Sequence, residues 1–440
     1  MSVKVRFAPS PTGKLHIGNI RAALVNWLFA KQQSGTFVLR IDDTDVERST
    51  KENEEAIKSD LTWLGLLWDE TFRQSERFDR YNEIVVALKE AGRLYACYET
   101  ADELDVKRKI QMGRGMPPVY DRAALALSAD DIKNFESEGR KPHWRFKLDV
   151  PGRVEWTDLI RGRVSIVMES VSDPILIRED GSFLYTLPSV VDDSDYGITH
   201  IVRGEDHVTN SAVQVQLFEA VGGKVPEMAH FALMTGKGGE GLSKRHGAMS
   251  IGEYRNESGL EPMSIVSLMA RVGTSEPIEA FSSAKPLIDG FDFSKFSRST
   301  AKLDPADLEM LNAKLLHSLP YEEVQSKLDG VSEEMWRAIQ PNLNKLSDVA
   351  DLLRIINGPV IPIIEDPEHI AKVRDLLPEG EITPETWATW TTVIKQELGV
   401  KGKALFKPLR GALTGQEHGP EMAVLLPLIG RERVLERLAG

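Results

Sequence analysis

The first forty residues follow a pattern that few folds accommodate: a strand, a turn-rich loop, a helix and a second strand. Val3, Val5 and Phe7 alternate with polar residues, which is typical of a strand, whereas apolar residues at helical spacing follow over 20–28. Gly35 ends that helix, and residues 36–41 form a second strand candidate that runs into acidic sequence. This order predicts a βαβ unit and therefore a parallel sheet of the α/β class.

The connection after the first strand, "FAPSPTGKLHIGN" over residues 7–19, contains far more turn formers than a simple connection needs. It lies at the carboxyl end of the strand, where open α/β sheets bind ligands. Gly13 and Gly18 allow a ligand to approach the backbone, the following helix N-terminus favours anions, and His16 is placed to donate to a phosphate oxygen. The spacing matches neither a dinucleotide fingerprint nor a phosphate loop. A stiff connector with a half-buried His16 therefore remains an equally good interpretation.

Length and composition narrow the classes of protein that fit. The chain has 440 residues, 41% of them hydrophobic and 28% charged, so we expect a globular protein of two to four domains. We find neither a long apolar run for a membrane span nor a secretory signal, and we expect a cytoplasmic protein without a membrane partner. Cys97 is the only cysteine, which excludes an internal disulfide and a cysteine-cluster metal site.

The net charge of −13 argues against indiscriminate coating of nucleic acid, but local basic segments leave room for a specific nucleic-acid partner. Each segment alone is more typical of a solvated face. The candidates are residues 106–115, 139–147, 242–247 and 400–411.

The rest of the chain suggests an interrupted α/β domain followed by helices. Residues 96–182 are irregular, basic and rich in proline and glycine. Strand patterns return near 183–187 and 199–203, with a helix over 211–221, and helical periodicity dominates beyond about residue 250. We therefore expect a split Rossmann-like domain, an inserted α+β domain and an all-α C-terminal region. The expected boundaries are 1–95 with 183–240, then 96–182, 241–310 and 311–440.

Five segments, in this order along the chain, resemble class I aminoacyl-tRNA synthetases in the form carried by glutamyl-tRNA synthetases. The class signature HIGH reads His16-Ile17-Gly18-Asn19, and the loss of its last histidine is common in that subgroup. "GLSKRHG" resembles the second signature, KMSKS, with Gly241 in place of its first lysine and Lys244 as its second. The five segments are "RFAPSPTGKLHIGN" (6–19), "LRIDDTDVERS" (39–49), "VVDDSDYGITHIVRGEDH" (190–207), "GLSKRHG" (241–247) and "GKALFKPLRGALTG" (402–415).

The resemblance implies an ATP-dependent reaction that joins glutamate to AMP as an acyl-adenylate and then passes it to the 3′-terminal adenosine of tRNA. His16, Lys244 and Arg245 are the expected catalytic groups, facing the ATP phosphates from two sides. Without the N-terminal signature, the Lys244 segment would be interpreted as an exposed basic turn. The resemblance places the ATP-binding residues at Thr12, Gly18, Asn19, Glu205, Ser243 and Lys244, with weaker support for His207.

For glutamate, the resemblance implies two guanidinium groups, Arg6 and Arg203, that bind the side-chain carboxylate through paired hydrogen bonds. A surface ion pair is the simpler alternative for either arginine. Asp42 stands where the family usually has glutamate and is expected to face the substrate amino group. The remaining expected glutamate-binding residues are Ser10, Tyr185 and Ser189, the last of which replaces the usual asparagine.

The resemblance also implies partners and cofactors. We expect ATP with Mg²⁺ held by phosphate oxygens and water, and no zinc, because Cys97 stands alone where some members bind that metal through several cysteines. The insertion is expected to bind the tRNA acceptor end, residues 241–310 the stem, and the C-terminal region the anticodon. We expect a monomer that charges tRNA(Glu), and residues 340–353 leave tRNA(Gln) open as a second substrate.

Four rival functions fit less well. A paralogue that glutamylates a modified tRNA base lacks the anticodon-binding half, and bacterial glutaminyl enzymes build theirs from β-barrels. A tRNA-independent nucleotidyltransferase has no use for the insertion and the helical region. A catalytically silent tRNA-binding paralogue is disfavoured because His16, Lys244, Arg6 and Arg203 are all present, although Gly241, Asp42 and Ser189 keep it open.

Overall fold

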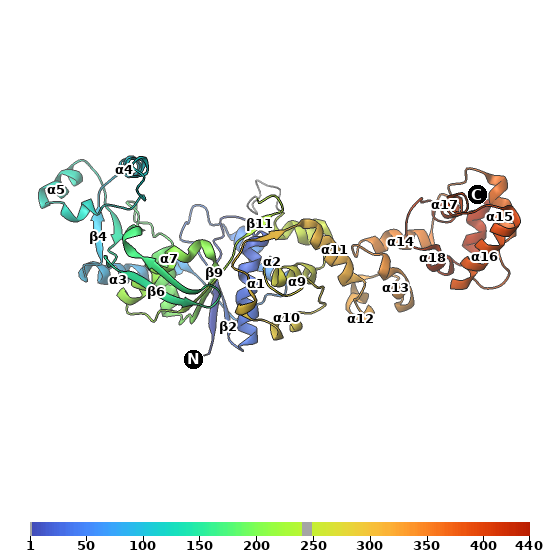
Figure 1. Ribbon diagram of the computed structural model, residues 1–440, viewed down its shortest axis with the longest axis horizontal. Coiled ribbons are helices and arrows are strands. Elements are labelled where there is room, and N and C mark those ends of the chain that lie inside the picture. Colours follow the sequence, from blue (N-terminus) through green and yellow to red (C-terminus); the bar gives the residue numbers. More distant parts are fainter. Residues whose placement is uncertain (1, 240–248) are drawn as a thin grey trace. The chain divides into compact units, whose positions relative to one another are not determined.

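The computed structural model describes residues 2–239 and 249–440 (Figure 1). The chain forms two compact units. Unit 1 consists of Met1–Ser258, Ile265–Glu279 and Ser283–Asp304, and unit 2 of Gly259–Ser264, Ala280–Ser282 and Pro305–Gly440. Among the described helices, none combines the length and the apolar character that crossing a membrane requires.

Parallel strands form the centre of unit 1. β1 (Lys4–Phe7), β2 (Thr36–Ile41) and β3 (Glu70–Arg73) pair in that order, and β9 (His200–Gly204) pairs with β10 (Glu227–Phe231), all parallel. The backbone N–H of Thr199 donates to the carbonyl of Lys4 at 2.9 Å, which places β9 beside β1. The predicted parallel-sheet fold is therefore confirmed.

The helix α1 (Ile17–Gln32) is buried around nearly its whole circumference, because apolar residues occupy several of its faces. The helix ends before Gly35, whose backbone N–H donates to the Ala30 carbonyl at 2.8 Å. A Cβ at Gly35 would lie 2.3 Å from the Val3 carbonyl oxygen, so only glycine lets the chain pass β1 and enter β2.

One predicted element of unit 1 is wrong. Residues 183–187 were expected to form a strand, but Phe183 makes only an isolated bridge with Ile177, and α6 (Thr186–Asp195) begins three residues later. Leu187, Val190 and Val191 share one buried face at helical spacing, and this burial outweighs the short alternating pattern before it. The other strands and helices of this part are α2 (Lys51–Trp63), α3 (Phe78–Glu90), α7 (Val208–Ala220), β11 (Met234–Gly236), α8 (Ile251–Glu253), α9 (Pro262–Arg271), α10 (Lys285–Asp289) and β12 (Ala301–Leu303).

The inserted stretch forms an antiparallel sheet and a hairpin that share the core of unit 1. Phe146, Met168 and Leu176 belong to the same buried cluster as Val38 and Tyr81. The backbone N–H of residue 159 donates to the carbonyl of residue 228 at 2.9 Å, which joins the hairpin to β10. The elements are β4 (Leu94–Cys97), α4 (Ala101–Gly113), α5 (Ala129–Ser137), β5 (His143–Phe146), β6 (Arg153–Asp158), β7 (Gly162–Val167) and β8 (Ile175–Ile177).

A chain of buried ion pairs connects β1, β2 and α6. Arg40 holds Asp42 through two hydrogen bonds of 2.6 and 3.1 Å and donates to Asp193 at 2.8 Å. Asp193 also accepts from Nε of Arg6 at 3.0 Å. All four side chains are buried, and their charges cancel, which is the condition under which buried ions are tolerated.

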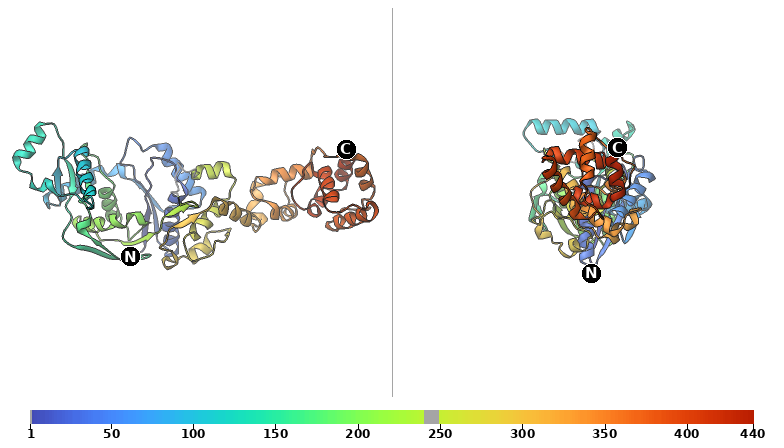
Figure 2. Two further views of the ribbon diagram at one scale, coloured as in Figure 1. Left: turned by 45° about the horizontal axis from the view of Figure 1, so that its top comes forward. Right: turned by 90° about the vertical axis from the view of Figure 1, so that its right-hand side faces the viewer.

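Unit 2 is helical, as the sequence predicted for the C-terminal third: within residues 305–440, all described, every named element is a helix (Figure 2). Trp336 and Trp390 are completely buried, and each indole N–H donates to a backbone carbonyl at 3.0 Å. Arg437 donates to the carbonyls of Leu413 and Ile356. The α-helices are α11 (Pro305–Leu316), α12 (Tyr321–Val324), α13 (Glu333–Ile339), α14 (Asp348–Asn357), α15 (Pro367–Asp375), α16 (Pro384–Leu398), α17 (Lys403–Thr414), α18 (Met422–Ile429) and α19 (Arg431–Ala439).

The ion-pair chain predicts a strong asymmetry between two charge-removing substitutions. Asp193→Asn leaves Arg6 and Arg40 with a single carboxylate between them, so we expect the free energy of unfolding of unit 1 to fall by about 3–5 kcal/mol. Glu70→Gln removes the partially exposed partner of Lys4 and should cost less than ~1 kcal/mol. Urea unfolding curves of the two variants and the wild type measure the difference. Equal losses would contradict a special role for the buried chain.

Candidate functional site

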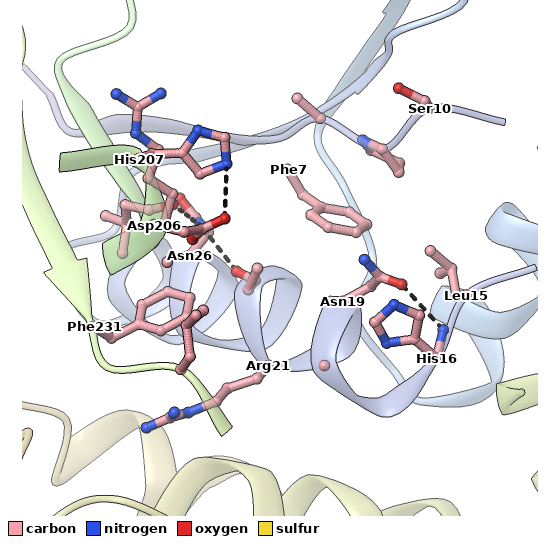
Figure 3. A pocket seen from close by; sticks show the side chains of 18 of the residues that line it. Phe7, Ser10, Leu15, His16, Asn19, Arg21, Asn26, Asp206, His207 and Phe231 are labelled. Carbon is pink, nitrogen blue, oxygen red and sulfur yellow. Dashed lines mark hydrogen bonds and ion pairs between the residues drawn. The ribbon is translucent and has the colours of Figure 1, made fainter. Parts of the chain in front are cut away.

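A cavity of about 660 Å³ opens at the carboxyl ends of β1, β9 and β10 (Figure 3). Its walls come from the loop after β1, the first turns of α1, and the ends of β9 and β10. This is the position that the strand–loop–helix pattern predicted for a ligand site. Expected site residues along this wall are Arg6, Ser10, Thr12, His16, Gly18, Asn19, Tyr185, Arg203 and His207.

The N-terminus of α1 presents His16 and its backbone N–H groups to the cavity. The backbone N–H of His16 donates to the side-chain oxygen of Asn19 at 3.1 Å, so Asn19 fixes the start of the helix (Figure 3). A Cβ at Gly18 would lie only 3.1 Å from the His16 ring, which explains the glycine at this position. A helix start of this kind favours an anionic ligand group.

Ser243, Lys244 and Arg245 lie outside the described residues. The described segments on either side of them border the same cavity. Met234 lines it, and Ser250 forms an antiparallel bridge with His16.

Arg203 is a buried cation whose hydrogen-bond partners in the described part of the chain are all neutral. Its Nη1 donates to the Tyr185 hydroxyl at 3.1 Å, Nη2 donates to Ser211 Oγ at 2.7 Å and Gln214 Oε1 at 2.6 Å, and Nε donates to His230 Nε2 at 3.4 Å. Only 6% of the residue is exposed, and burial lowers the pKa of its guanidinium. A desolvated guanidinium that lines a cavity without an ion pair among these partners is suited to an anionic ligand.

Arg6 lines the same cavity but is paired. Both hydrogen bonds to Asp193 use Nε, at 3.0 and 3.2 Å, in a pair that is buried rather than on the surface. Tyr185 accepts a hydrogen bond from Arg203 and lies in the field of both arginines. Desolvation of its hydroxyl raises the pKa of this phenol, but the positive charge of Arg203 and then of Arg6 outweighs it, and the net shift is downward.

Three expected site residues are placed differently, outside the cavity wall. Asp42 and Ser189 both bind the buried guanidinium of Arg40, Ser189 through its Oγ at 2.8 Å. Burial raises the pKa of Asp42 to about 6, with the Arg40 charge opposing the shift. Glu205 forms an ion pair with Arg161 at 2.6 Å. Direct contact of these three with a substrate remains a prediction.

Two residues of the wall were missed in the sequence. Arg21 donates to the carbonyls of Ala232 and Val272, and burial lowers the pKa of its guanidinium to about 10. Asn26 donates to the Val202 carbonyl at 2.9 Å and so joins α1 to β9. Both line the cavity. The sequence does contain one indication of both residues. They are polar residues within an otherwise apolar, buried helix, where a polar side chain needs a hydrogen-bond partner.

Cys97, Glu99 and His143 form a group whose ligand atoms lie within 4.8 Å of one another. Burial raises the pKa of the Cys97 thiol to about 11, so it is protonated at neutral pH. The Tyr120 hydroxyl contacts Sγ at 3.7 Å and donates to Glu99 at 2.8 Å. A structural zinc needs a thiolate and usually four ligands, and this group offers three with the thiol neutral. These residues therefore do not fit a zinc ion.

The fold and the cavity agree with the family matches. Residues 2–310 match the family described as tRNA synthetases class I (E and Q), catalytic domain, and residues 308–440 match the anticodon binding domain. Together they define a class I aminoacyl-tRNA synthetase with a helical anticodon-binding region, and the expected fold class is confirmed.

Curated relatives narrow the class. The chain is 57% identical to glutamate–tRNA ligase 1 of Maricaulis maris and 56% identical to glutamate–tRNA ligase 2 of Hyphomonas neptunium, with 99% of each chain covered in both cases. A crystal structure of a glutamate tRNA ligase from Elizabethkingia meningosepticum in complex with its amino acid is 26% identical, with a TM-score of 0.84 and coverage of 100% and 98%. The chain belongs to the glutamate–tRNA ligase family.

The geometry around Cys97 predicts weak zinc retention. After incubation with excess Zn²⁺ and desalting, we expect well below one zinc per chain by elemental analysis, because binding must first deprotonate a buried thiol. His143→Ala serves as the control and should retain the same amount. One zinc per chain that is lost in the His143 variant would contradict the assignment.

Proposed function

We propose that this protein joins L-glutamate to tRNA in an ATP-dependent reaction, through a glutamyl-adenylate and transfer to the 3′-terminal adenosine. The observation that carries the proposal is the buried Arg203 guanidinium, which lines the cavity beside Arg6 and has only neutral hydrogen-bond partners in the described chain. The carboxylate of a glutamate side chain would provide the negative charge that pairs with this buried guanidinium. A neutral amino acid such as glutamine would leave the guanidinium unpaired.

In this assignment, Arg203 and the terminal nitrogens of Arg6 bind the glutamate side chain, and Tyr185 and Ser10 orient the amino acid. Asp42 and Ser189, expected at the same site, affect glutamate binding indirectly. Both bind Arg40, and Arg40 in turn binds Asp193, the partner of Arg6. A contact of Asp42 with the substrate amino group would run through water.

ATP binds along the other half of the cavity. Gly18 and Asn19 bring the N–H groups of the α1 terminus to the phosphates, Thr12 lies in the preceding loop, and His16 donates to the α-phosphate region. Lys244, with Ser243 and Arg245, is assigned the role of stabilising charge on the departing pyrophosphate. Mg²⁺ enters with ATP, held by phosphate oxygens and water, and Glu205 remains a proposed contact on the adenosine side.

Unit 2 would read the anticodon and the insertion would bind the acceptor end of tRNA(Glu). The rival assignment, glutamyl transfer to a modified tRNA base, is not favoured, because helices continue through residue 439 and the relatives match over nearly the whole chain. We further propose a cytoplasmic monomer. The proposal keeps tRNA(Gln) as a second substrate, and charging purified tRNA(Glu) and tRNA(Gln) side by side measures the preference.

The proposal predicts a large effect of removing one charge. Arg203→Gln keeps a polar side chain but loses the cation, so kcat/KM for glutamate in tRNA charging should fall by about 100-fold or more. Arg80→Gln, a partly exposed arginine of α3 outside the cavity wall and the insertion, is the control and should charge tRNA at the wild-type rate. A wild-type protein that charges tRNA equally well with glutamine, or an Arg203 variant with unchanged kinetics, would refute the assignment.

A second prediction concerns the phosphates. Lys244→Ala should lower the rate of ATP–pyrophosphate exchange, measured with tRNA present, by about 100-fold, the usual effect of losing one group that stabilises developing charge. Binding of tRNA, measured by filter retention, should stay unchanged, since the phosphates of ATP and not the tRNA are affected. Normal aminoacylation by this variant would show that Lys244 has no such role.

A further inference from the structure

A buried polar chain runs from the hairpin of the inserted stretch to Arg203. Asp158, the last residue of β6, contacts His230 Nδ1 with its Oδ2 at 2.5 Å. His230 Nε2 lies 2.8 Å from Ser211 Oγ, which accepts from Arg203 Nη2 at 2.7 Å. All four residues are at least nine-tenths buried, and Asp158 and His230 are 72 positions apart in the sequence.

The chemistry of the two ends fixes the tautomer of His230. Arg203 can only donate, and ionised Asp158 can only accept. Burial raises the pKa of Asp158, but hydrogen bonds from His230 and from nearby backbone N–H groups outweigh it and lower the pKa to about 2, so it is a carboxylate at neutral pH. Its Oδ1 already accepts from three backbone N–H groups, including that of His230 at 3.0 Å. His230 must then carry its proton on Nδ1, which leaves Nε2 to accept from Arg203 Nε at 3.4 Å and from the Ser211 hydroxyl, whose other acceptor is the His207 carbonyl.

We propose that the Asp158–His230–Ser211 chain is a positioning device for Arg203 in the glutamate site, an inference that rests on the function proposed above. The chain orients the guanidinium at two points, through Nη2 by way of Ser211 and through Nε, which donates to His230 Nε2 at 3.4 Å. It directs the Asp158 charge toward Arg203 through neutral groups. A carboxylate bound directly to Arg203 would compete with the carboxylate of the substrate. Placing the charge behind His230 avoids that competition and keeps the guanidinium available at the cavity.

A second contact from the same turn supports this role. Arg161, three residues after Asp158, forms a 2.6 Å ion pair with Glu205, two residues after Arg203. Asp158 and the turn between β6 and β7 therefore contact both neighbouring strands, at His230 of β10 and at Glu205 after β9. The hairpin also joins β10 through the backbone, so a shift of the hairpin would displace the groups that hold Arg203.

Two buried carboxylates of the insertion provide a matched comparison. Asp158→Asn turns an amide N–H toward His230 Nδ1, which forces the proton to Nε2 and reverses the chain. We expect KM for glutamate to rise about tenfold, with kcat and the KM values for ATP and tRNA within about twofold of wild type. Asp173→Asn disturbs an equally buried carboxylate that binds Arg122 and Tyr95, and should leave KM for glutamate unchanged. Equal effects of the two substitutions on KM for glutamate would overturn the proposal.

The position of His230 between Asp158 and both contacts to Arg203 gives a test that a merely structural role would not pass. His230→Gln removes the group through which Asp158 reaches Arg203, directly and by way of Ser211, and should raise KM for glutamate by a similar factor. In the double variant, Asp158→Asn should then add less than about twofold, because both substitutions break one path. Multiplied effects in the double variant would overturn the proposal.

The tautomer of His230 can be observed without any activity. Long-range ¹⁵N–¹H correlation spectra of the full chain, assigned with His230→Gln, should show the Nδ1-protonated form. The Nε2-protonated form would refute the chain even in an enzyme that charges tRNA normally. Failure of the wild-type protein to charge tRNA with glutamate would instead refute the proposed function, so the two failures are distinguishable.

Discussion

The buried chain Asp42–Arg40–Asp193–Arg6 is the constraint on which the cavity depends. It joins two neighbouring parallel strands to α6, whose Asp193 lies 187 positions after Arg6, beyond the whole insertion. Each of these four charges has a partner of opposite sign. If one side chain moved out of the interior, its partner would remain buried as an unpaired charge. Because of this requirement, the polypeptide that follows the insertion must place α6 beside β1 and β2, where Asp193 can pair with Arg6 and Arg40. The chain of ion pairs thereby fixes the end of β1, which lines the cavity, and α6, which directly follows Tyr185 of the cavity wall.

Arg203 differs from this group of paired charges because none of its described hydrogen-bond partners carries a negative charge. Arg40 is neutralised by two carboxylates, whereas Arg203 donates to a phenol, a hydroxyl, an amide and an imidazole. Arg203 is therefore a buried cation of the cavity wall whose described hydrogen-bond partners are polar but neutral, and they are side chains rather than the backbone carbonyls that hold Arg21. Such a group is costly until an anion arrives, and that cost makes the site selective for a charged side chain over its amide. In the proposed site, Arg40 therefore serves the fold, Arg203 serves the ligand, and Arg6 serves both, through Nε to Asp193 and through its terminal nitrogens to the ligand.

The features that could be predicted from the sequence are those that depend on local residue patterns. The strand, loop and helix over residues 3–41 follow from periodicity and turn formers, and the cavity at the end of β1 follows from them. Partners brought together over long separations could not be predicted: Asp193 for Arg6, and Asp158 for His230, have no local signal. The motif that contains Asp42 and Ser189 located the site but not the direction of these side chains, which point to Arg40. At 183–187, a short alternating run was outweighed by helical burial over the residues that follow.

The two larger additions to the α/β core differ in how independent they are. The helices of unit 2 bury a core of their own around Trp336 and Trp390. The insertion instead shares its core with Val38 and Tyr81, and its residues Asp158 and Arg161 contact His230 of β10 and Glu205 after β9. A change of composition along the chain marks the insertion but does not show this difference, because composition does not determine which residues are in contact. If Asp158 positions Arg203 through His230 as proposed, the insertion contributes to glutamate binding as well as to the proposed contact with tRNA.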